Sequence, residues 1–342
     1  MRKELISDSL NQYKANLHCH STYSDGCFTP EQIKEHYKSH GYHAVAFTDH
    51  DIFVPHDELR DEDFIPLHGY EIEVDEEGED YNQIRTCHLC CVALDENIRT
   101  PVCLHHSRYM FAGALTYFHE MAPFEGDYVR SYDPKCINDI ISKAKEAGFF
   151  VTYNHPVWSM ENYPQYSQYR GMDAVEMFNY LSIVGGLDEY NHQIYEDLLL
   201  LGLDLGCTGN DDNHNSDRED PGMDSCGAWT MLAAPELSYA SLADALKNGN
   251  YYASMGPSIL SLYVEDGVVH VRTSDAVSIN FSTGIRHTAR ISAKEGETVN
   301  EGRFSLRPQD GYFRVMVEDA TGKRAYSRGY RLDRWGLLDG DN

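Results

Sequence analysis

The sequence predicts an α/β domain, built as a barrel or a doubly wound sheet, followed by a small antiparallel β-domain. Signals for strands and helices alternate from about residue 15 to residue 250, as either of these architectures requires. After Pro257 the pattern changes to short alternating runs, such as "VVHVRTS" and "YFRVMVED", which are separated by Gly, Asp and Asn turns. We therefore expect two domains, at residues 1–257 and 258–342.

The helix and strand signals follow one another along the first domain. Residues 29–32, "TPEQ", form a capping box with proline at the first helical position, and Gly41 ends this helix. The strand "HAVAFTDH" follows directly. A second helix begins at Asp133 and ends at Gly148, before the strand "FFVTYNHP". Further on come the strand "DAVEMFN", an amphipathic helix at about residues 187–201, the segment "LDLGCTGNDDNH" and a last helix at residues 236–247.

Composition and charge exclude several classes of partner. The chain carries 55 acidic against 28 basic residues, a formal charge of −27. This charge repels nucleic acid and anionic membranes, which both require clustered Lys and Arg, so we expect neither as a partner. No apolar run approaches the roughly 18 residues that cross a bilayer, and the N-terminal segment lacks the apolar core of a secretory signal. We therefore expect a cytoplasmic protein.

Histidine and carboxylate side chains recur where apolar strands end. His18 and His20 lie two residues apart on a strand, so both point to one face. Five further strand segments carry comparable residues: Asp49 and His50 in "HAVAFTDH", Glu71 in "FIPLHGYE", His88 in "CHLCCVAL", His155 in "FFVTYNH", and Asp212 with His214 in "LDLGCTGNDDNH". One such histidine is usually an ordinary hydrogen-bonded residue, but coincidence is a poor explanation for six strands. The ends of barrel strands meet at one mouth, so we predict a shared metal cluster.

The successive motifs resemble those of the PHP (polymerase and histidinol phosphatase) metal-dependent phosphoesterases. They are "HCHSTYSDG", "FTDHD", "GYEIE", the histidine of "CHLCC", "YNHP" and "NDDNH", in the family's order and at fitting spacing. The resemblance covers about residues 14–257, and the β-domain after it makes the chain similar to two-domain PHP metallohydrolases. The resemblance implies a distorted seven-stranded (β/α) barrel, the PHP fold, followed by a small sandwich-like β-domain.

The resemblance also implies three divalent metal ions, and imidazole with carboxylate but without thiolate favours Zn, Mn or Fe. One ion is held by His18, His20, Glu71 and Asp212; Glu71 bridges to a second held by His88 and His155; and Asp25, His50 and His214 hold the third. The family commonly has Gly-Ser-Asp-x-His in its last motif, whereas Asn210 and Asp211 precede Asp212 here. The Asp-x-His spacing favours Asp212 over Asp211 as the ligand.

The resemblance and the cluster together predict a phosphoesterase, a hydrolase acting on a small phosphate monoester or diester. We expect a metal-bridging hydroxide in a trinuclear site to attack phosphorus, with Glu71, His155 and Asp212 as the catalytic residues. The expected partner is a small anionic phosphorylated substrate. Salt screens the charge of the whole chain beyond roughly 8 Å, so this substrate can still approach the ions. No GxSxG motif or phosphate-binding glycine loop points to a protein nucleophile.

Further residues are expected to support the ligands and the substrate. Asp49, Asp51, Asn154 and Asn179 are predicted to orient the metal-binding histidines from behind. Arg218, just past the last ligands, is a candidate phosphate-binding residue, and Arg85 and Arg108 are others. Candidate leaving-group acids, which the sequence does not rank, are His105, His106, His119 and His192.

Three other functions stay open at this stage. A metal-dependent hydrolase of a carboxylic ester, amide or carbamate would use the same residues. A nucleic-acid-associated module is disfavoured by the charge, and a binding-only PHP domain is disfavoured by the complete set of ligand positions. The sequence leaves open whether the C-terminal β-domain joins the chain into a homo-oligomer, gates the substrate or caps the barrel, and whether residues 96–130 cover the site.

Overall fold

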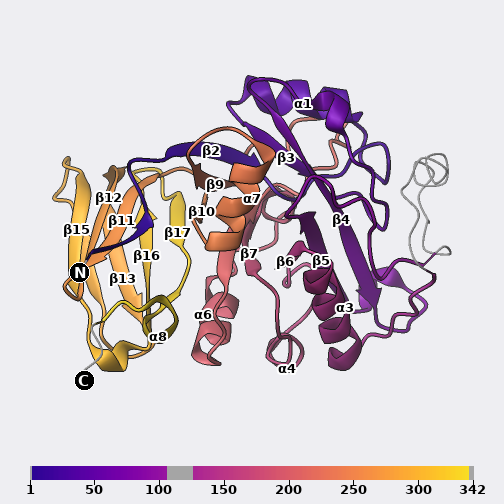
Figure 1. The fold of residues 1–342 in the computed structure, drawn as a ribbon. Helices are drawn as coiled ribbons and strands as arrows, with labels where there is room; N and C mark the ends of the chain where they lie inside the picture. The colour runs from indigo at the N-terminus through magenta and orange to yellow at the C-terminus, as the bar shows by residue number, and fades with distance from the viewer. Residues whose placement is uncertain (1, 106–125, 339–342) are drawn as a thin grey trace.

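Residues 2–105 and 126–338 are described by a computed structural model (Figure 1). The first part of the chain forms an α/β region, and the residues after 257 form an all-β region beside it. The mixed α/β class with a C-terminal all-β region is therefore confirmed. No helix in the described part of the chain combines the length and the apolar composition needed to span a membrane.

The α/β region is built on strands that follow one another in the sheet. They are β2 (Asn11–Asn16), β3 (Ala44–Phe47), β4 (Ile65–Asp75), β5 (Thr86–Ala93), β6 (Phe149–Tyr153), β7 (Ala174–Asn179) and β8 (Gly206–Asn210). β2, β3 and β4 are parallel, as are β6, β7 and β8, whereas β5 is antiparallel to both of its neighbours. β9 (Trp229–Ala234) pairs antiparallel with β2, and β10 (Tyr251–Ser254) pairs with β9.

The predicted closed (β/α)7 barrel is not confirmed, because the sheet that the structure describes is open. β8 ends this sheet, and no strand pairing joins it to β9 within the described residues. The Thr230 hydroxyl of β9 instead accepts a hydrogen bond from Gly209 N at 3.2 Å and lies 3.1 Å from Gly209 O. Hydrogen bonds of one side chain thus replace backbone pairing between β8 and β9, and the sheet does not close there.

Two of the four longer helices that the structure describes, α1 (Pro30–Ser39) and α3 (Pro134–Glu146), follow the predicted start and stop signals. α1 begins with the capping box of Thr29 and Gln32, and Gly41 follows it with a φ of 74°. Asp133 caps α3 by accepting from backbone amides of the first turn. α6 (His192–Leu200) and α7 (Tyr239–Asn248) both begin later than predicted. The shorter helices are α4 (Tyr163–Tyr166), α5 (Tyr180–Val184) and α8 (Leu332–Trp335).

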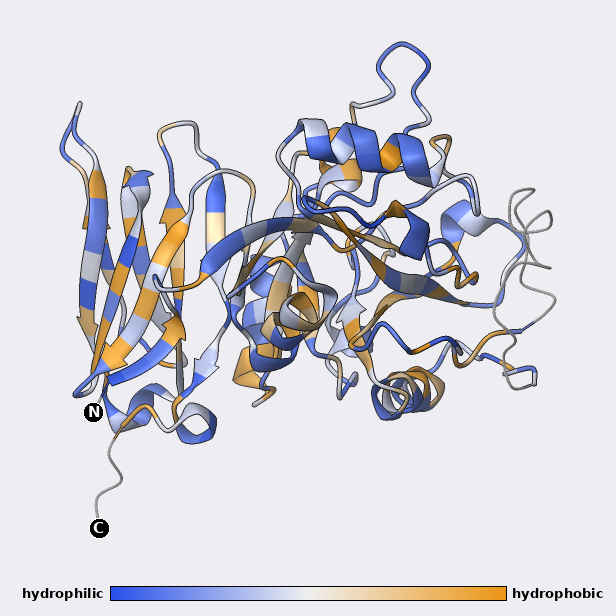
Figure 2. Ribbon diagram, turned by 45° about the horizontal axis from the view of Figure 1, so that its top comes forward, coloured by the Kyte–Doolittle hydropathy of each residue, from blue (hydrophilic) through white to orange (hydrophobic). Residues whose placement is uncertain are grey.

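The all-β region packs two layers of antiparallel strands. One layer has the order β1 (Arg2–Ile6), β11 (Ile259–Glu265), β12 (Val268–Ala276) and β15 (Val299–Ser305). The other has the order β14 (Ala289–Ser292), β13 (Ser278–Thr283), β16 (Tyr312–Glu318) and β17 (Arg324–Ser327), with β18 (Tyr330–Arg331) beside β16. Hydrophobic and hydrophilic residues alternate along these strands (Figure 2). Each strand therefore buries one face, and both layers contribute to one core.

Strand pairings cross the predicted domain boundary in two places. β1, at the N-terminus, pairs with β11, and β10 pairs with β17, so one layer of the all-β region continues into the α/β sheet. Ion pairs also connect the regions, with Arg314 2.7 Å from Glu196 and Arg328 2.9 Å from Asp204. The division at residue 257 stays a prediction, and β1 belongs to the all-β region although it precedes that boundary.

Candidate metal centre

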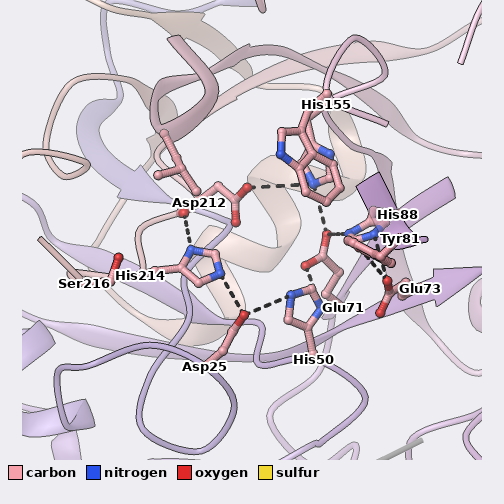
Figure 3. Close-up of a pocket in the computed structure, with 12 residues that line it drawn as sticks. Asp25, His50, Glu71, Glu73, Tyr81, His88, His155, Asp212, His214 and Ser216 are labelled. Carbon is pink, nitrogen blue, oxygen red and sulfur yellow. Dashed lines mark hydrogen bonds and ion pairs between the residues drawn. The ribbon is translucent and has the colours of Figure 1, made fainter. Parts of the chain in front are cut away.

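Nine side chains selected from the sequence meet beside the α/β sheet. His18 and His20 follow β2, Asp25 lies in the next turn, His50 follows β3, Glu71 lies in β4, His88 in β5, His155 follows β6, and Asp212 with His214 follow β8. Seven of them line a cavity of about 540 Å³ (Figure 3). The other two, His18 and His20, are fully buried against Glu71 and Asp212. The structure thus brings all nine predicted residues together, although the sheet is open.

The central set of ligand atoms comes from His18, His20, Glu71 and Asp212. His18 Nε2 lies 3.1 Å from His20 Nε2, 3.1 Å from Glu71 Oε2 and 3.0 Å from Asp212 Oδ1. His20 Nε2 lies 3.2 Å from Glu71 Oε2 and 3.0 Å from Asp212 Oδ1. Metal–ligand bonds of about 2.0–2.2 Å place neighbouring ligand atoms roughly 3 Å apart. The four atoms therefore fit one divalent ion.

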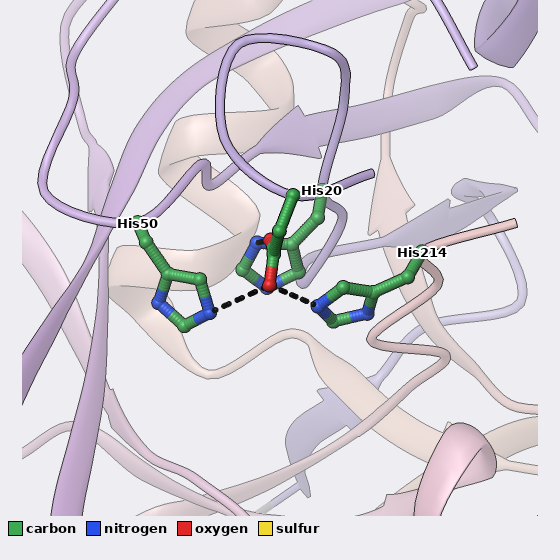
Figure 4. Close-up of side chains that lie close together, drawn as sticks. His20, His50 and His214 are labelled. Atoms are coloured by element: carbon green, nitrogen blue, oxygen red, sulfur yellow. Dashed lines mark ion pairs between the residues drawn. The ribbon is translucent and has the colours of Figure 1, made fainter. Parts of the chain in front are cut away.

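A second set of ligand atoms lies around Asp25. Its Oδ2 is 3.3 Å from His214 Nε2 and 3.9 Å from His50 Nε2. Figure 4 shows His50 and His214 on opposite sides of this oxygen. The ring of His20 lies parallel to that of His214 at 4.3 Å, and its Nδ1 is 3.6 Å from Asp25 Oδ1. Ligand atoms of all four residues lie within 4.8 Å of one another. These are the residues predicted to hold the third ion, Asp25, His50 and His214, and His20 lies beside them.

Glu71 connects the central set to His88 and His155. Its Oε1 lies 3.0 Å from His88 Nδ1 and 3.3 Å from His155 Nε2. Its Oε2 faces His18 and His20. The two oxygens of one carboxylate therefore face two different groups of histidines, which is the arrangement that a bridging ligand needs.

Buried polar atoms without a hydrogen bond support the metal interpretation. Within the described residues, no hydrogen bond reaches Glu71 Oε2 or His88 Nε2, although both atoms are buried. An uncompensated buried polar atom is costly, and a bound cation would satisfy it. Imidazole nitrogen with carboxylate oxygen is also a donor set that suits Zn, Mn or Fe. The residues of the centre therefore fit divalent ions.

Charge interactions keep the carboxylates of the centre ionised. Burial opposes ionisation of Glu71, but the positive charge of His18 and His88 outweighs burial, so the pKa of Glu71 lies well below its usual range. His18 and His20 lower the pKa of Asp212 in the same way, against its burial. For His20, burial lowers the pKa, whereas the neighbouring carboxylates of Asp212 and Glu71 raise it to about 10. Metal binding must displace this proton, so we expect binding to release protons.

Two of the predicted supporting residues, both amides, contact the carboxylate ligands. Asn154 Nδ2 donates to Glu71 Oε1 at 3.1 Å. Asn179 Nδ2 donates to Asp212 Oδ2 at 3.0 Å. Both asparagines are fully buried, so each holds its carboxylate in one orientation. They act on carboxylates rather than on the histidines expected from the sequence.

Asp49 and Asp51 have different surroundings. Asp49 Oδ1 accepts hydrogen bonds from the amide and the hydroxyl of Ser24 at 3.1 and 2.8 Å. Ser24 Oγ lies 3.3 Å from His20 Nδ1, so Asp49 acts on His20 through Ser24. Asp51 is paired with the guanidinium of Arg130, whose Nη1 donates to Asp51 Oδ2 at 2.9 Å. A role for Asp51 toward a histidine ligand stays a prediction.

Glu176, which was not selected from the sequence, fixes the orientation of His18. His18 Nδ1 lies 3.1 Å from Glu176 Oε1, which leaves Nε2 to face the central set. Glu176 in turn accepts hydrogen bonds from the side chains of Asn179 and Asn210, each at 2.9 Å, and from the amide of His155 at 3.1 Å. A carboxylate behind a metal-binding histidine sets its tautomer. The available signal was a glutamate inside the otherwise apolar strand "AVEMF".

Glu73, Tyr81 and Trp158 line the cavity and were also not selected. Glu73 Oε1 lies 3.7 Å from His88 Nε2 and accepts a hydrogen bond from the Tyr81 hydroxyl at 2.7 Å. Glu73 could have been found, because it stands two residues after Glu71 on β4 and so shares its face. Tyr81 and Trp158 lie outside the strands, and no periodicity marks them.

The candidate phosphate-binding and acid residues that the structure describes do not line the cavity. Arg218 is exposed and does not line it. Arg85 pairs with Glu76 at 3.3 Å. His192 is exposed at the start of α6, and His105 lies 3.9 Å from Asp127. Arg108, His106 and His119 lie outside the described residues.

The fold and the site define an α/β protein with a buried histidine–carboxylate centre that fits divalent metal ions. Residues 16–168 match the model of the PHP domain family. The resemblance of the motifs to that family is therefore confirmed over these residues. Seven of the nine selected residues lie in the matched range, and Asp212 and His214 follow it.

Solved structures that resemble this chain share little sequence identity with it. One is a two-domain protein from Bacteroides vulgatus ATCC 8482 that contains a predicted PHP-like metal-dependent phosphoesterase. It has 16% identity and a TM-score of 0.45, and the match covers 93% of this chain and 95% of that chain. Another is an amidohydrolase from Chromobacterium violaceum with bound sulfate and no metal, at 15% identity and a TM-score of 0.39, covering 60% of this chain and 89% of that chain. A search of curated proteins finds no match.

Proposed function

We propose that this protein hydrolyses a small phosphate ester with the help of divalent metal ions. The observation that carries the proposal is the meeting of nine histidine and carboxylate side chains, from segments far apart in the sequence, in and beside one cavity of about 540 Å³. Cavities that bind small ligands have volumes of roughly 300–1,000 Å³. The PHP domain found in residues 16–168 agrees with this assignment.

The side chains of the centre form three sets, and each set would bind one metal ion. His18, His20, Glu71 and Asp212 would hold the first ion; Glu71 with His88 and His155 would hold the second; and Asp25, His50 and His214 would hold the third. When bound, divalent ions lower the pKa of water toward neutrality and offset negative charge on phosphoryl oxygens.

The charge of the cavity favours an anionic substrate only when ions are bound. Among the described residues that line it, none is Lys or Arg, and four are carboxylates: Asp25, Glu71, Glu73 and Asp212. Three divalent ions would outweigh these four carboxylates and leave a net charge of about +2. The positive charge that attracts a phosphate must therefore come mainly from the ions.

The chain itself contributes fixed orientations. Glu176 holds His18 through Nδ1, and Asn179 holds the carboxylate of Asp212. His214 Nδ1 donates to the backbone oxygen of Asp212 at 2.9 Å, which leaves its Nε2 facing Asp25. These contacts preorganise the ligand atoms before any ion or substrate binds.

A neutral carboxylic ester, amide or carbamate is the second candidate substrate. The observation that favours it is the lack of Lys and Arg among the described residues that line the cavity, because none of these side chains then marks a place for an anionic group. Glu73 adds negative charge to the same wall. The same ligand residues would serve both reactions.

The test is product release by the Mn²⁺- or Zn²⁺-loaded protein from p-nitrophenyl phosphate, bis(p-nitrophenyl) phosphate and p-nitrophenyl acetate. The three compounds share one leaving group, so they compare the bond that is broken. We expect turnover of a phosphate ester by the wild type. His155→Ala should lose bound metal and at least about 100-fold in activity.

His192→Ala is the matched control, because it removes an exposed histidine that does not line the cavity. It should retain both metal and activity. Turnover of the acetate alone would favour the neutral substrate instead. Full metal content and activity in His155→Ala would contradict the assignment of His155.

A further inference from the structure

We propose that the cavity contains a subsite for an aromatic ring of the substrate, formed by Tyr81, Trp158 and Leu181. All three side chains line the cavity together with the predicted metal ligands. This inference rests on the proposed function, because it names the chemical group that is attached to the hydrolysed bond.

Tyr81 and Trp158 form an aromatic wall at the His88 end of the cavity. Their ring centroids lie 6.2 Å apart. The Trp158 ring also lies 5.4 Å from His88 and 5.1 Å from His155, in edge contacts. Figure 3 shows Tyr81 beside His88, on the side of the cavity away from His214. A ring bound against this wall would therefore lie next to the metal-ligand residues.

Trp158 is held in place by a buried carboxylate. The backbone amides of Val157 and Trp158 donate to the two oxygens of Glu189 at 3.0 and 2.7 Å. Glu189 is fully buried and also accepts a hydrogen bond from Asn191 Nδ2 at 2.8 Å. The main chain is thus fixed at Trp158, a residue that is 38% exposed. A large apolar side chain held at the opening of a cavity is typical of a ligand-binding surface.

Tyr81 is fixed through its polar end. Its hydroxyl donates to Glu73 Oε1 at 2.7 Å. Tyr81 also begins the short helix η2 (Tyr81–Gln83), whose N-cap Asp80 accepts from the amide of Asn82 at 3.0 Å. The residue is 47% exposed, so with the hydroxyl engaged its ring offers an apolar surface. Leu181, at the start of α5, adds an aliphatic surface to the same cavity.

The wall selects an uncharged planar group. The described residues that line the cavity include no Lys or Arg, and Glu73 places a negative charge beside Tyr81. A second phosphate or a carboxylate on the substrate would be repelled there. Aromatic rings, in contrast, bind Tyr and Trp through stacked or edge contacts and through burial of apolar surface. We therefore infer an aryl group on the substrate.

Binding of four unreactive anions to the Mn²⁺-loaded protein tests the subsite separately from the reaction. Phenylphosphonate, methylphosphonate, benzoate and acetate combine two head groups with two tails, and isothermal titration calorimetry gives a Kd for each. The comparison of phenyl with methyl compounds tests the aromatic subsite. The comparison of phosphonates with carboxylates tests the phosphoesterase proposal. We expect each phenyl compound to bind about tenfold more tightly than its methyl counterpart.

Variants of Trp158 assign the preference to the wall. Trp158→Ala should reduce the phenyl preference to about twofold or less, and Trp158→Phe, which keeps a ring, should retain most of it. Tyr163→Ala is the matched control, because Tyr163 is an exposed aromatic residue that does not line the cavity. Equal binding of phenyl and methyl compounds by the wild type, or a preference that survives Trp158→Ala, would overturn the subsite. Tighter binding of the carboxylates than of the phosphonates would contradict the phosphoesterase proposal and leave the subsite standing.

Discussion

Asp211 and Asp212 are neighbours in the sequence but face different surroundings. Asp211 accepts hydrogen bonds from the backbone amides of Cys226, Gly227 and Ala228 at 2.8–3.0 Å. Asp212 Oδ1 instead lies 3.0 Å from two imidazole nitrogens of the central set. Asp211 therefore orders a loop, while Asp212 lies among the predicted metal ligands.

We expect Asp212→Asn to lose bound metal and at least about 100-fold in activity. Asp211→Asn should keep its metal but lose about 1–3 kcal/mol of unfolding free energy, because an amide NH₂ would face backbone donors. Mass spectrometry of bound metal and urea unfolding measure the two effects. Greater loss of metal in Asp211→Asn than in Asp212→Asn would show that Asp212 is wrongly assigned as the ligand of the last motif.

His68 connects stability to pH. It is buried in β4, with its Nε2 3.1 Å from Asp57 Oδ1. Burial lowers the pKa of His68 from 6.5 to about 4, Arg99 and His56 act in the same direction, and Asp57 offsets them only in part. The folded protein thus keeps this imidazole neutral at pH values where the unfolded chain protonates it.

We expect His68 to cost the folded state about 2 kcal/mol between pH 7 and pH 5. The loss begins as the pH falls through the unfolded pKa of 6.5, and it levels off below about 4, where the folded form also binds the proton. His68→Gln should lack this part of the pH dependence in urea unfolding at both pH values. Identical pH dependence in wild type and variant would rule out the assignment.

Among the elements, β1 shows how a segment distant in sequence completes a region. It pairs antiparallel with β11, from Arg2 opposite Glu265 to Ile6 opposite Leu262. Leu5 and Ile6 are buried in the core of the all-β region. The segment "RKELI" is short and largely charged, so its local pattern does not predict a strand.

We expect Ile6→Ala to reduce the unfolding free energy by about 2–5 kcal/mol, because it opens a cavity in that core. Lys3→Ala is the control on the same strand, since Lys3 is exposed and should change stability by no more than about 0.5 kcal/mol. Urea unfolding compares the two variants. Similar effects of both would mean that β1 does not pack as described.

For the whole molecule, the continuous sheet makes the α/β region and the all-β region depend on each other. β10 pairs with β17, and the rings of Tyr312 and Tyr326 belong to the core of the α/β region. A break after residue 257 would leave β10 with an unpaired edge and would remove side chains from that core. The two predicted domains therefore share hydrogen bonds and apolar contacts.

We expect a chain that ends at residue 257 to lack cooperative unfolding, and the 342-residue chain to unfold in one transition. Urea unfolding followed by near-UV circular dichroism distinguishes the two behaviours. The 342-residue chain under the same conditions is the control. A truncated chain that binds metal and unfolds cooperatively would show that the boundary separates independent domains.

The sequence alone predicts the residues of the centre through local strand geometry together with the resemblance of its motifs to the PHP family. His18 and His20 share a face through the two-residue period of a strand, and the Asp-x-His spacing of that family's last motif favours Asp212 over Asp211. The start of α1 was likewise readable from the capping box at Thr29. These features depend only on residues that are close together in the chain.

Tertiary structure alone decided the features that depend on distant segments. Strand direction and pairing are set by long-range contacts, so the antiparallel β5, the open edge at β8 and the partner of β1 have no local signal. Glu176 supports His18, and Trp158 lies against His88, only because the fold brings their segments together. The sequence determined which residues could bind metal, and packing determined what orients them and what lies beside the substrate.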